Sequence, residues 1–188
     1  MSTLSSHTPI VESPAHTPSL PPVWTGLWAN ESATQSFATH LAQALLTWSG
    51  GRDARIELRG NLGAGKTTLV RHLLRAAGVQ GRIKSPTYAV VEPHQAGLGE
   101  NAWPIWHFDF YRFSDPQEWE DAGFRDIFAG PGLKLMEWPD KVAGQLPPAD
   151  LVIALHALDE DQRQVSMGAQ TPAGQQWLND WVAREHAR

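Results

Sequence analysis

The sequence predicts a single α/β domain, built as a three-layer sandwich around a mostly parallel sheet. Short apolar or alternating segments, which suit strands, interleave with longer segments whose apolar residues recur at helical spacing. The chain has 188 residues, of which 41% are hydrophobic, so it can build one core and has little room for a second. A glycine-rich turn between a predicted strand and a predicted helix supports the same fold class.

The first 22 residues differ in composition from the rest of the chain. They are rich in Ser, Thr and Pro and carry almost no charge. Such a segment cannot bury enough apolar surface to offset the entropy of ordering it. We therefore expect a disordered extension over residues 1–22 and a folded domain over residues 23–188, which begins near Trp24.

Composition and charge exclude several classes of protein. The chain has no cysteine, which excludes disulfides, thiolate metal sites and cysteine nucleophiles. Its formal net charge of −5 argues against strong nonspecific binding to nucleic acid. No Lys or Arg precedes Arg52 and no apolar run approaches the length of a membrane span, so we expect neither a targeting peptide nor membrane association. A cytoplasmic location follows by elimination.

The first part of the domain is expected to contain a helix, a strand and a second helix. Residues 32–35 match a capping box and precede apolar residues at helical spacing, which predicts a helix that stops at Gly50 and Gly51. Residues 55–59 alternate between apolar and polar, which predicts a strand. Residues 67–77 have the pattern of a helix, ended by Gly78.

Further strands are expected along the second part of the chain. The predicted segments are residues 88–92, 103–109, 133–137, 151–157 and 164–167. A surface loop over residues 95–101 is expected between the first two of these strands, and the last is expected to pair back as an edge strand.

Two more helices have recognisable start signals. Asp115 and Pro116 suit the start of a short acidic helix that runs to about Ala122. Thr171 and Pro172 suit the start of a last helix. The buried face of that helix is expected to carry Trp177, Leu178 and Trp181.

Residues 60–67 match the P-loop pattern G-x-x-x-x-G-K-[ST], so the fold is expected to be P-loop NTPase-like. Glycines let backbone N–H groups approach phosphates, and the following helix adds the positive end of its dipole. Lys66 is expected to reach the β- and γ-phosphates and Thr67 to bind Mg²⁺. The predicted nucleotide contacts in this turn are Leu62, Gly63, Ala64, Gly65, Lys66, Thr67 and Thr68.

Two carboxylates follow apolar segments at positions that suit a catalytic site. Asp109 ends one predicted strand and Glu137 ends the next. An open α/β sheet binds its ligands at the carboxyl ends of its strands, and magnesium prefers oxygen ligands. One acid is therefore expected to contact magnesium and the other to orient the attacking water. The residues alone leave open which acid has which role.

Three further features each have a structural and a functional interpretation. Residues 84–88 lie where many P-loop proteins carry a switch segment, and they equally suit a proline turn before a strand. Trp138 suits either the core or stacking on a base. His107 lies within an apolar segment, which favours a hydrogen-bonded core residue over a metal ligand.

Taken together, these motifs resemble those of the TsaE family, also called YjeE. The matching segments, in this order, are GNLGAGKTT (60–68), KSPTY (84–88), VEP (91–93), HFDFYR (107–112) and EWP (137–139). The similarity extends from about Trp24 to Met167. Each motif apart from the P-loop is by itself only a modest signal of the family, whereas the five motifs together are a specific one.

The resemblance implies a small ATPase that works with the proteins TsaD and TsaB. That machinery installs N6-threonylcarbamoyladenosine next to the anticodon of tRNAs that read codons beginning with A. ATP hydrolysis supports repeated turnover by the partners, and the chain contacts tRNA only indirectly, through the complex. The resemblance implies that Glu137 binds magnesium, that Asp109 and Lys66 are catalytic, that Trp138 lies beside the nucleotide, and that Thr34 lies near the adenine.

Three rival functions can be compared with this one. A P-loop small-molecule kinase would need an acceptor pocket and usually an arginine-bearing lid, and the sequence has no arginine-rich insertion in a suitable place. A GTPase would need an N-K-x-D motif, and no asparagine here precedes a lysine. A nucleotide-responsive binding module without useful turnover is the third rival. The kinase is the main alternative to the ATPase.

Overall fold

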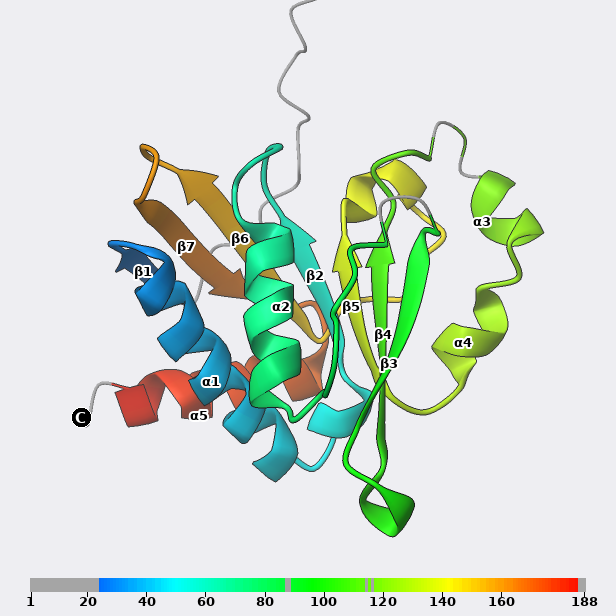
Figure 1. Cartoon of the computed structure of the whole chain (residues 1–188), viewed down its shortest axis with the longest axis horizontal. Coiled ribbons are helices and arrows are strands. Elements are labelled where there is room, and N and C mark those ends of the chain that lie inside the picture. The colour runs from blue at the N-terminus through cyan, green and yellow to red at the C-terminus, as the bar shows by residue number, and fades with distance from the viewer. Residues whose placement is uncertain (1–23, 87–88, 114, 116, 186–188) are drawn as a thin grey trace, which may run out of the picture.

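A seven-stranded sheet runs through the centre of the computed structural model, which describes residues 24–86, 89–113, 115 and 117–185 (Figure 1). The strand order is β1-β7-β6-β2-β5-β4-β3. The strands are β1 (Trp24–Trp28), β2 (Arg55–Arg59), β3 (Val91–Ala96), β4 (Trp103–Asp109), β5 (Leu133–Glu137), β6 (Leu151–Ala157) and β7 (Arg163–Gly168).

The sheet is parallel at its centre and antiparallel toward both edges. The pairs β6–β2, β2–β5 and β5–β4 are parallel, whereas β7 is antiparallel to β6 and to β1, and β3 is antiparallel to β4. The predicted mostly parallel sheet is therefore found in the four central strands. Their carboxyl ends meet at one edge, the upper one in Figure 1, where an open α/β sheet places its ligands.

The helices cover the two faces of the sheet unequally. They are α1 (Glu31–Thr47), α2 (Lys66–Ala76), α3 (Gln117–Asp121), α4 (Arg125–Ala129) and α5 (Pro172–Glu185). The helices α1, α2 and α5 share one large apolar cluster with the sheet, which includes Leu41, Leu74 and Leu178. A second cluster on the other face, around Phe108 and Met136, packs beside α3 and α4. The third layer of the predicted sandwich thus covers mainly β4 and β5.

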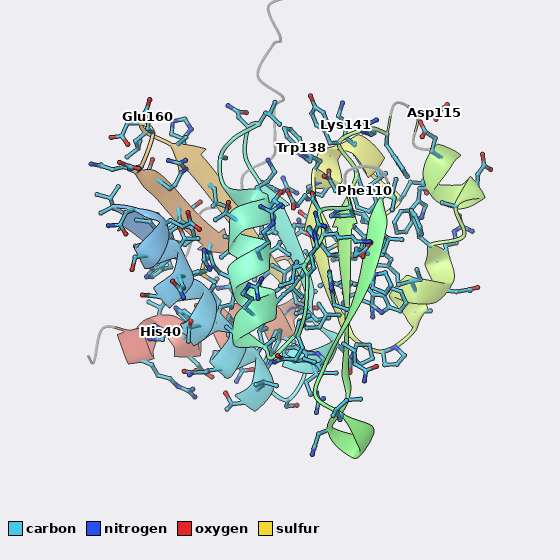
Figure 2. All side chains as sticks on the ribbon, in the orientation of Figure 1. His40, Phe110, Asp115, Trp138, Lys141 and Glu160 are labelled. Atoms are coloured by element: carbon cyan, nitrogen blue, oxygen red, sulfur yellow. The ribbon has the colours of Figure 1, made fainter. Side chains whose placement is uncertain are left out.

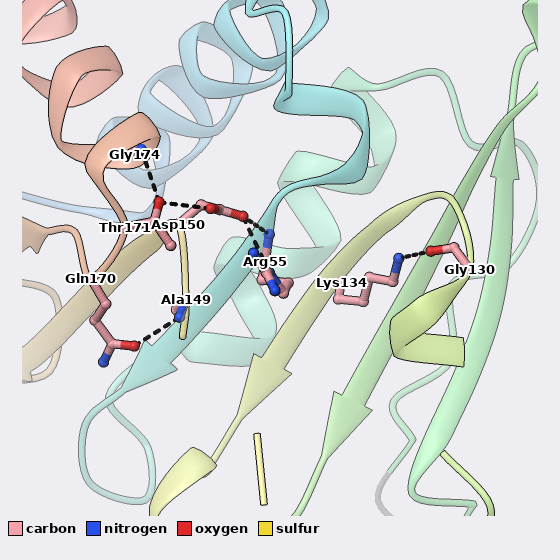
Figure 3. Close-up of polar contacts among 8 residues, drawn as sticks. All are labelled: Arg55, Gly130, Lys134, Ala149, Asp150, Gln170, Thr171 and Gly174. Carbon is pink, nitrogen blue, oxygen red and sulfur yellow. Dashed lines mark hydrogen bonds and ion pairs between the residues drawn. The ribbon is translucent and has the colours of Figure 1, made fainter. Parts of the chain in front are cut away.

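Hydrogen bonds around Asp150 attach α5 to the amino ends of β2 and β6 (Figure 3). The Arg55 backbone N–H donates to Oδ2 of Asp150 at 2.9 Å, and the Thr171 hydroxyl donates to Oδ1 at 2.8 Å. The backbone N–H of Gly174 donates to the Thr171 hydroxyl at 3.0 Å, which confirms the predicted cap of this helix. Figure 3 also shows the Lys134 ammonium donating to the carbonyl of Gly130.

Four predicted strands match the structure to the residue, namely β2, β4, β5 and β6. The helix predicted over residues 67–77 begins and ends one residue earlier, and Gly78 follows it with a φ of 96°. The short acidic helix is confirmed as α3, where Glu118 accepts a hydrogen bond from the Asp115 backbone N–H at 3.1 Å. The three residues expected on the buried face of α5 are buried.

Other sequence predictions were wrong in detail. The first helix is capped by Asn30, whose side chain accepts from the Ala33 N–H, and not by the capping box at 32–35. The strand predicted over 88–92 begins at Val91 and continues through Pro93 to Ala96, which is possible because β3 is an edge strand. Gln95 therefore belongs to this strand and not to the predicted loop.

The edge of the sheet was also assigned wrongly. The segment predicted as an edge strand, β7, lies inside the sheet because β1 pairs with its outer side. Neither β1 nor α4 was predicted. The extension over residues 1–22 lies outside the described residues. None of the described helices is long and apolar enough to cross a bilayer.

Candidate nucleotide-binding site

The glycine-rich segment forms a tight turn from β2 into α2, in the strand–turn–helix context that the sequence predicts. Gly60, Gly63 and Gly65 have φ angles of 136°, 77° and 101°, which residues with a Cβ adopt only with strain. A Cβ on Gly60 would also collide with the carbonyl oxygen of Leu155 on β6. The turn is therefore held close to the end of the neighbouring strand, and the glycine pattern is a requirement of the backbone.

Lys66 lies folded back over this turn. Its ammonium donates to the carbonyl oxygens of Gly60 at 2.6 Å and Asn61 at 2.9 Å. The same nitrogen lies 3.9 Å from the centroid of the Trp138 ring, within cation–π distance. Burial lowers the pKa of Lys66, and the nearby carboxylates of Glu137 and Asp109 oppose that shift.

Thr67, Glu137 and His107 form a chain of hydrogen bonds behind the turn. The Thr67 hydroxyl donates to Oε2 of Glu137 at 2.9 Å, and Nε2 of His107 lies 2.8 Å from Oε1 of the same carboxylate. Glu137 and His107 are both buried. An ionised carboxylate only accepts, so we assign the proton of this contact to Nε2 of His107. The sequence prediction that His107 is a hydrogen-bonded core residue is confirmed.

Asp109 lies directly beside Glu137, because the two residues are register partners at the ends of β4 and β5. Oδ1 of Asp109 accepts a hydrogen bond from the Tyr111 backbone N–H at 3.1 Å. Burial raises the pKa of Asp109 and the charge of Glu137 raises it further, while the Tyr111 hydrogen bond works in the opposite direction. The structure thus brings together the two acids that the sequence placed at strand ends.

Two residues near these acids have strained backbones. Trp138 has a φ of 59° and Val90 a φ of 64°, both in the left-handed region that residues with side chains rarely adopt. The Trp138 ring lies 4.9 Å from the ring of Tyr111, at the upper edge of the sheet in Figure 2. Val90 follows the predicted switch segment, of which residues 87 and 88 lie outside the described residues, and its carbonyl accepts from the Asp109 N–H.

A pocket of about 130 Å³ lies on the side of the turn that faces α1 and β7. It is lined by residues of α1, of the turn and of β7, among them Thr34, Gly65, Thr68 and Arg163. Thr34 is buried in this wall although it precedes Gly60, the first residue of the turn, by 26 positions in the chain. The structure therefore places Thr34 beside the glycine-rich turn. That it lies near the adenine stays a prediction from the resemblance.

Sequence reasoning missed Arg163, a residue of β7 whose side chain is hydrogen-bonded to the glycine-rich turn. Its Nε donates to the Ala64 carbonyl at 3.1 Å, and its Nη1 donates to the carbonyl oxygens of Asp159, Glu160 and Gln162 at 3.0 to 3.1 Å. In the sequence Arg163 is a single arginine at the start of a strand, and no motif surrounds it. Only the packing of β7 beside β6 brings it to the turn.

The fold and the site together define an α/β protein with a P-loop sequence motif at the carboxyl edge of its parallel strands. A sequence model of the family described as "Threonylcarbamoyl adenosine biosynthesis protein TsaE" matches residues 28–165. Because this match covers most of the chain, the chain belongs to the TsaE family.

Individual relatives agree with this family. The chain is 40% identical over 146 residues to the "tRNA threonylcarbamoyladenosine biosynthesis protein TsaE" of Haemophilus influenzae, a match that covers 77% of this chain and 89% of the relative. The protein of the same name from Bacillus subtilis is 33% identical over 114 residues, covering 61% and 68%. The crystal structure of YdiB from Bacillus subtilis has the same fold, with a TM-score of 0.66 at 24% identity, over 86% of this chain and 95% of that one.

Proposed function

We propose that this chain is an ATPase of the machinery that makes N6-threonylcarbamoyladenosine next to the anticodon of tRNAs reading codons that begin with A. In this proposal it hydrolyses Mg-ATP to support repeated turnover by TsaD and TsaB. Membership of the TsaE family and the names of the relatives support the pathway. The net charge of −5 favours a role in which the partner proteins, and not this chain, bind the tRNA directly.

The observation that carries the proposal is the 2.9 Å contact between the Thr67 hydroxyl and the Glu137 carboxylate. A hydroxyl and a carboxylate on one side of a phosphate-binding turn suit Mg²⁺, which takes few protein ligands and completes its shell with phosphate and water oxygens. Thr67 and Glu137 would hold the ion. Bound magnesium would neutralise charge that develops on the phosphates during hydrolysis. Within the described residues, no three His, Asp or Glu side chains form a metal cage, which is compatible with such an open site.

Lys66 and the backbone of the turn would hold the phosphates. The Lys66 ammonium already points into the turn, where it bonds to the carbonyls of Gly60 and Asn61. Phosphate oxygens of ATP would replace these carbonyls as acceptors and would stabilise the charged form of the lysine. The backbone N–H groups from Leu62 to Thr68, together with the amino end of α2, would donate to the remaining phosphate oxygens.

Asp109 is the acid that we assign to the attacking water. Glu137 is engaged by Thr67 and His107. Asp109 is the neighbouring carboxylate, and no hydrogen bond from the described residues reaches its Oδ2. Burial raises the pKa of Asp109, and a raised pKa makes a carboxylate a better proton acceptor at neutral pH. Asp109 would orient the water and accept its proton.

Thr34 and Trp138 would contact the rest of the nucleotide from opposite sides of the turn. Thr34 lines the pocket between α1 and β7, which suits the adenine end of ATP. Trp138 lies over the Lys66 ammonium, where its ring would exclude water from the phosphates. These roles complete a site in which every proposed contact comes from the carboxyl edge of the sheet.

A reconstituted assay tests this function. ATP hydrolysis is measured with the chain alone, with TsaD and TsaB, and with TsaD, TsaB and tRNA, and modified adenosine is quantified in the same mixtures. We expect slow hydrolysis by the chain alone, and its loss in the mixture with the Lys66→Ala and Glu137→Ala variants. Hydrolysis that survives both changes would overturn the assignment. Phosphoryl transfer that requires a small acceptor and ignores the partner proteins would establish a small-molecule kinase instead.

A further inference from the structure

The two oxygens of the Glu137 carboxylate contact different side chains. Oε2 accepts from the Thr67 hydroxyl at 2.9 Å, and Oε1 lies 2.8 Å from Nε2 of His107. The proposed function uses Thr67 as a magnesium ligand and assigns no role to His107. The His107 ring is fully buried, and its Nδ1 has no hydrogen-bond partner among the described residues. The contact with Glu137 is therefore the interaction that offsets the cost of burying this polar ring.

Strand pairing fixes His107 and Glu137 on one face of the sheet. His107 is the register partner of Leu135 on β5, and Glu137 lies two residues further along that strand. Residues two apart on a strand point to the same face, which here is the face that shares its apolar cluster with α2. Both β4 and β5 are paired with a strand on each side. The imidazole is therefore a donor on a rigid backbone, which positions a partner more accurately than a loop does.

The contact from His107 uses the carboxylate oxygen that does not face Thr67. In the proposed site, magnesium is held by the Thr67 hydroxyl and by the Glu137 carboxylate, which meet at Oε2. No other described side chain donates a hydrogen bond to Oε1. The hydrogen bond from His107 can therefore be kept both when the ion is absent and when it is bound. It restricts rotation of the carboxylate in both states.

A carboxylate that is held in place binds a metal ion more tightly than one that rotates freely. Its rotamer freedom is lost before the ion arrives, so less entropy is lost on binding. Hydrogen bonds to metal-binding groups typically contribute about 10- to 100-fold in metal affinity. The contact between His107 and Glu137 has the form of such a bond, because an N–H donor meets a carboxylate oxygen at an ordinary hydrogen-bond distance.

We propose that His107 is a positioning residue for magnesium. Its Nε2–H group holds the Glu137 carboxylate in the orientation that binds the ion together with Thr67, while His107 itself contacts neither the ion nor the nucleotide. This inference rests on the proposed ATPase function, because it presupposes that Mg-ATP binds at Glu137. It adds a residue that acts on the affinity for magnesium and not on the affinity for the nucleotide alone.

Two amide variants of His107 separate the hydrogen bond from the burial of a polar side chain. His107→Gln can place an N–H donor near the position of Nε2, whereas the side chain of His107→Asn is one bond shorter and does not reach Glu137. Calorimetry measures the affinity for the non-hydrolysable analogue AMP-PNP, once with Mg²⁺ and once with EDTA. We expect Mg²⁺ to strengthen binding about 10-fold less in the Asn variant than in the natural chain. The Gln variant should resemble the natural chain, and the affinities in EDTA should be equal.

The matched control is His94→Asn on the neighbouring strand β3. His94 is the register partner of Ile105, so it lies on the same face of the sheet as His107, and no hydrogen bond between described residues joins it to Glu137. It should keep the natural response to Mg²⁺. A natural response in His107→Asn, or an equal loss in both Asn variants, would overturn the role of His107 and leave the proposed function standing. A natural chain whose binding ignores Mg²⁺ would overturn the proposed metal site as well.

A nitrogen-15 NMR spectrum of the histidine rings tests the contact without a substitution at His107 in the measured protein. The chain has eight histidines, and the signal missing from the His107→Gln variant identifies the ring. We expect the proton of His107 on Nε2, both in the free chain and with Mg²⁺ and AMP-PNP added. A ring that carries its proton on Nδ1 alone cannot donate to Glu137, and would overturn the proposal even if the Asn variant failed to fold.

Discussion

The Thr67 hydroxyl donates a hydrogen bond to Oε2 of Glu137 at 2.9 Å, although 70 positions separate the two residues in the chain. Parallel pairing of β2 with β5 brings them together, because Leu58 at the end of β2 is the register partner of Glu137. The hydroxyl that follows the P-loop lysine and the carboxylate that ends the neighbouring strand therefore meet at one point.

Replacing Glu137 with Gln should weaken magnesium binding while keeping the shape of the site. The amide can still accept from Thr67 but has lost the negative charge that attracts the ion. We expect the magnesium concentration for half-maximal ATP hydrolysis to rise about 10- to 100-fold. Magnesium titrations of ATP hydrolysis would measure this, with Glu92→Gln on the edge strand β3 as the control. An unchanged magnesium dependence would exclude Glu137 as a ligand.

Replacing Asp109 with Asn should have opposite effects on activity and on stability. Burial raises the pKa of Asp109, so the fold favours the protonated form and the ionised carboxylate destabilises it above the folded pKa. The Asn variant should thus melt at a higher temperature than the natural chain at pH 8. This advantage should shrink as the pH falls toward the ordinary aspartate range. Hydrolysis should fall about 100-fold because the general base is lost.

Melting curves between pH 5 and pH 8 would check the stability effect. Asp121→Asn, which removes an exposed carboxylate from α3, is the control and should show no such trend. A stabilisation of the Asp109 variant that grew toward acidic pH would contradict the sign. Natural-chain hydrolysis is expected to decline with falling pH at values above those of an ordinary aspartate, because the carboxylate must be ionised to accept a proton.

Arg163→Met should weaken nucleotide binding although Arg163 lies outside the P-loop motif. The guanidinium links the Ala64 carbonyl to three carbonyls of the β6–β7 turn, and its loss would let the glycine-rich turn move. We expect the dissociation constant for ATP to rise about 10-fold, which corresponds to about 1.4 kcal/mol. Calorimetric titration would measure it, with Arg125→Met on exposed α4 as the control. Equal affinities in both variants would show that Arg163 does not position the turn.

Gly174→Ala should destabilise the chain, although Ala is usually the better helix former. A Cβ at this position would collide with the backbone carbonyl of Asp150, which the Thr171 cap holds against α5. We expect a loss of about 1–3 kcal/mol in the free energy of unfolding and a melting temperature lower by several degrees. Gly168→Ala is the matched control, because a Cβ there meets nothing within 4 Å. Similar melting of both variants would contradict the clash.

The fold was largely predictable because the central strands carry strong local patterns. The strands β2, β4, β5 and β6 are short apolar or alternating runs with clear ends, and their bounds match the structure. The strand β1 was missed because its five residues, Trp-Thr-Gly-Leu-Trp, contain a glycine and do not alternate cleanly. The strand β3 was shortened because Pro93 opposes strand formation except at a sheet edge, and the sequence does not reveal which strand is at the edge.

The candidate site also has features that the sequence predicts and features that it does not. The glycine spacing, Lys66 and Thr67 form a contiguous motif whose backbone requirements are local, so the sequence alone was enough to predict the position of a phosphate site. The sequence also determined that Asp109 and Glu137 end strands, because the apolar runs before them are unambiguous.

Strand order and register decided the rest. Only the parallel pairing of β4 with β5 and of β5 with β2 places Asp109, Glu137 and Thr67 within reach of one another. The contribution of Arg163 depends on β7 lying beside β6, and the hydrogen bond from His107 to Glu137 depends on the pairing of their strands. These contacts join residues that are distant in the chain. Local sequence therefore determined which groups are candidates for the chemistry, and the free energy of packing the strands together determined which of them meet.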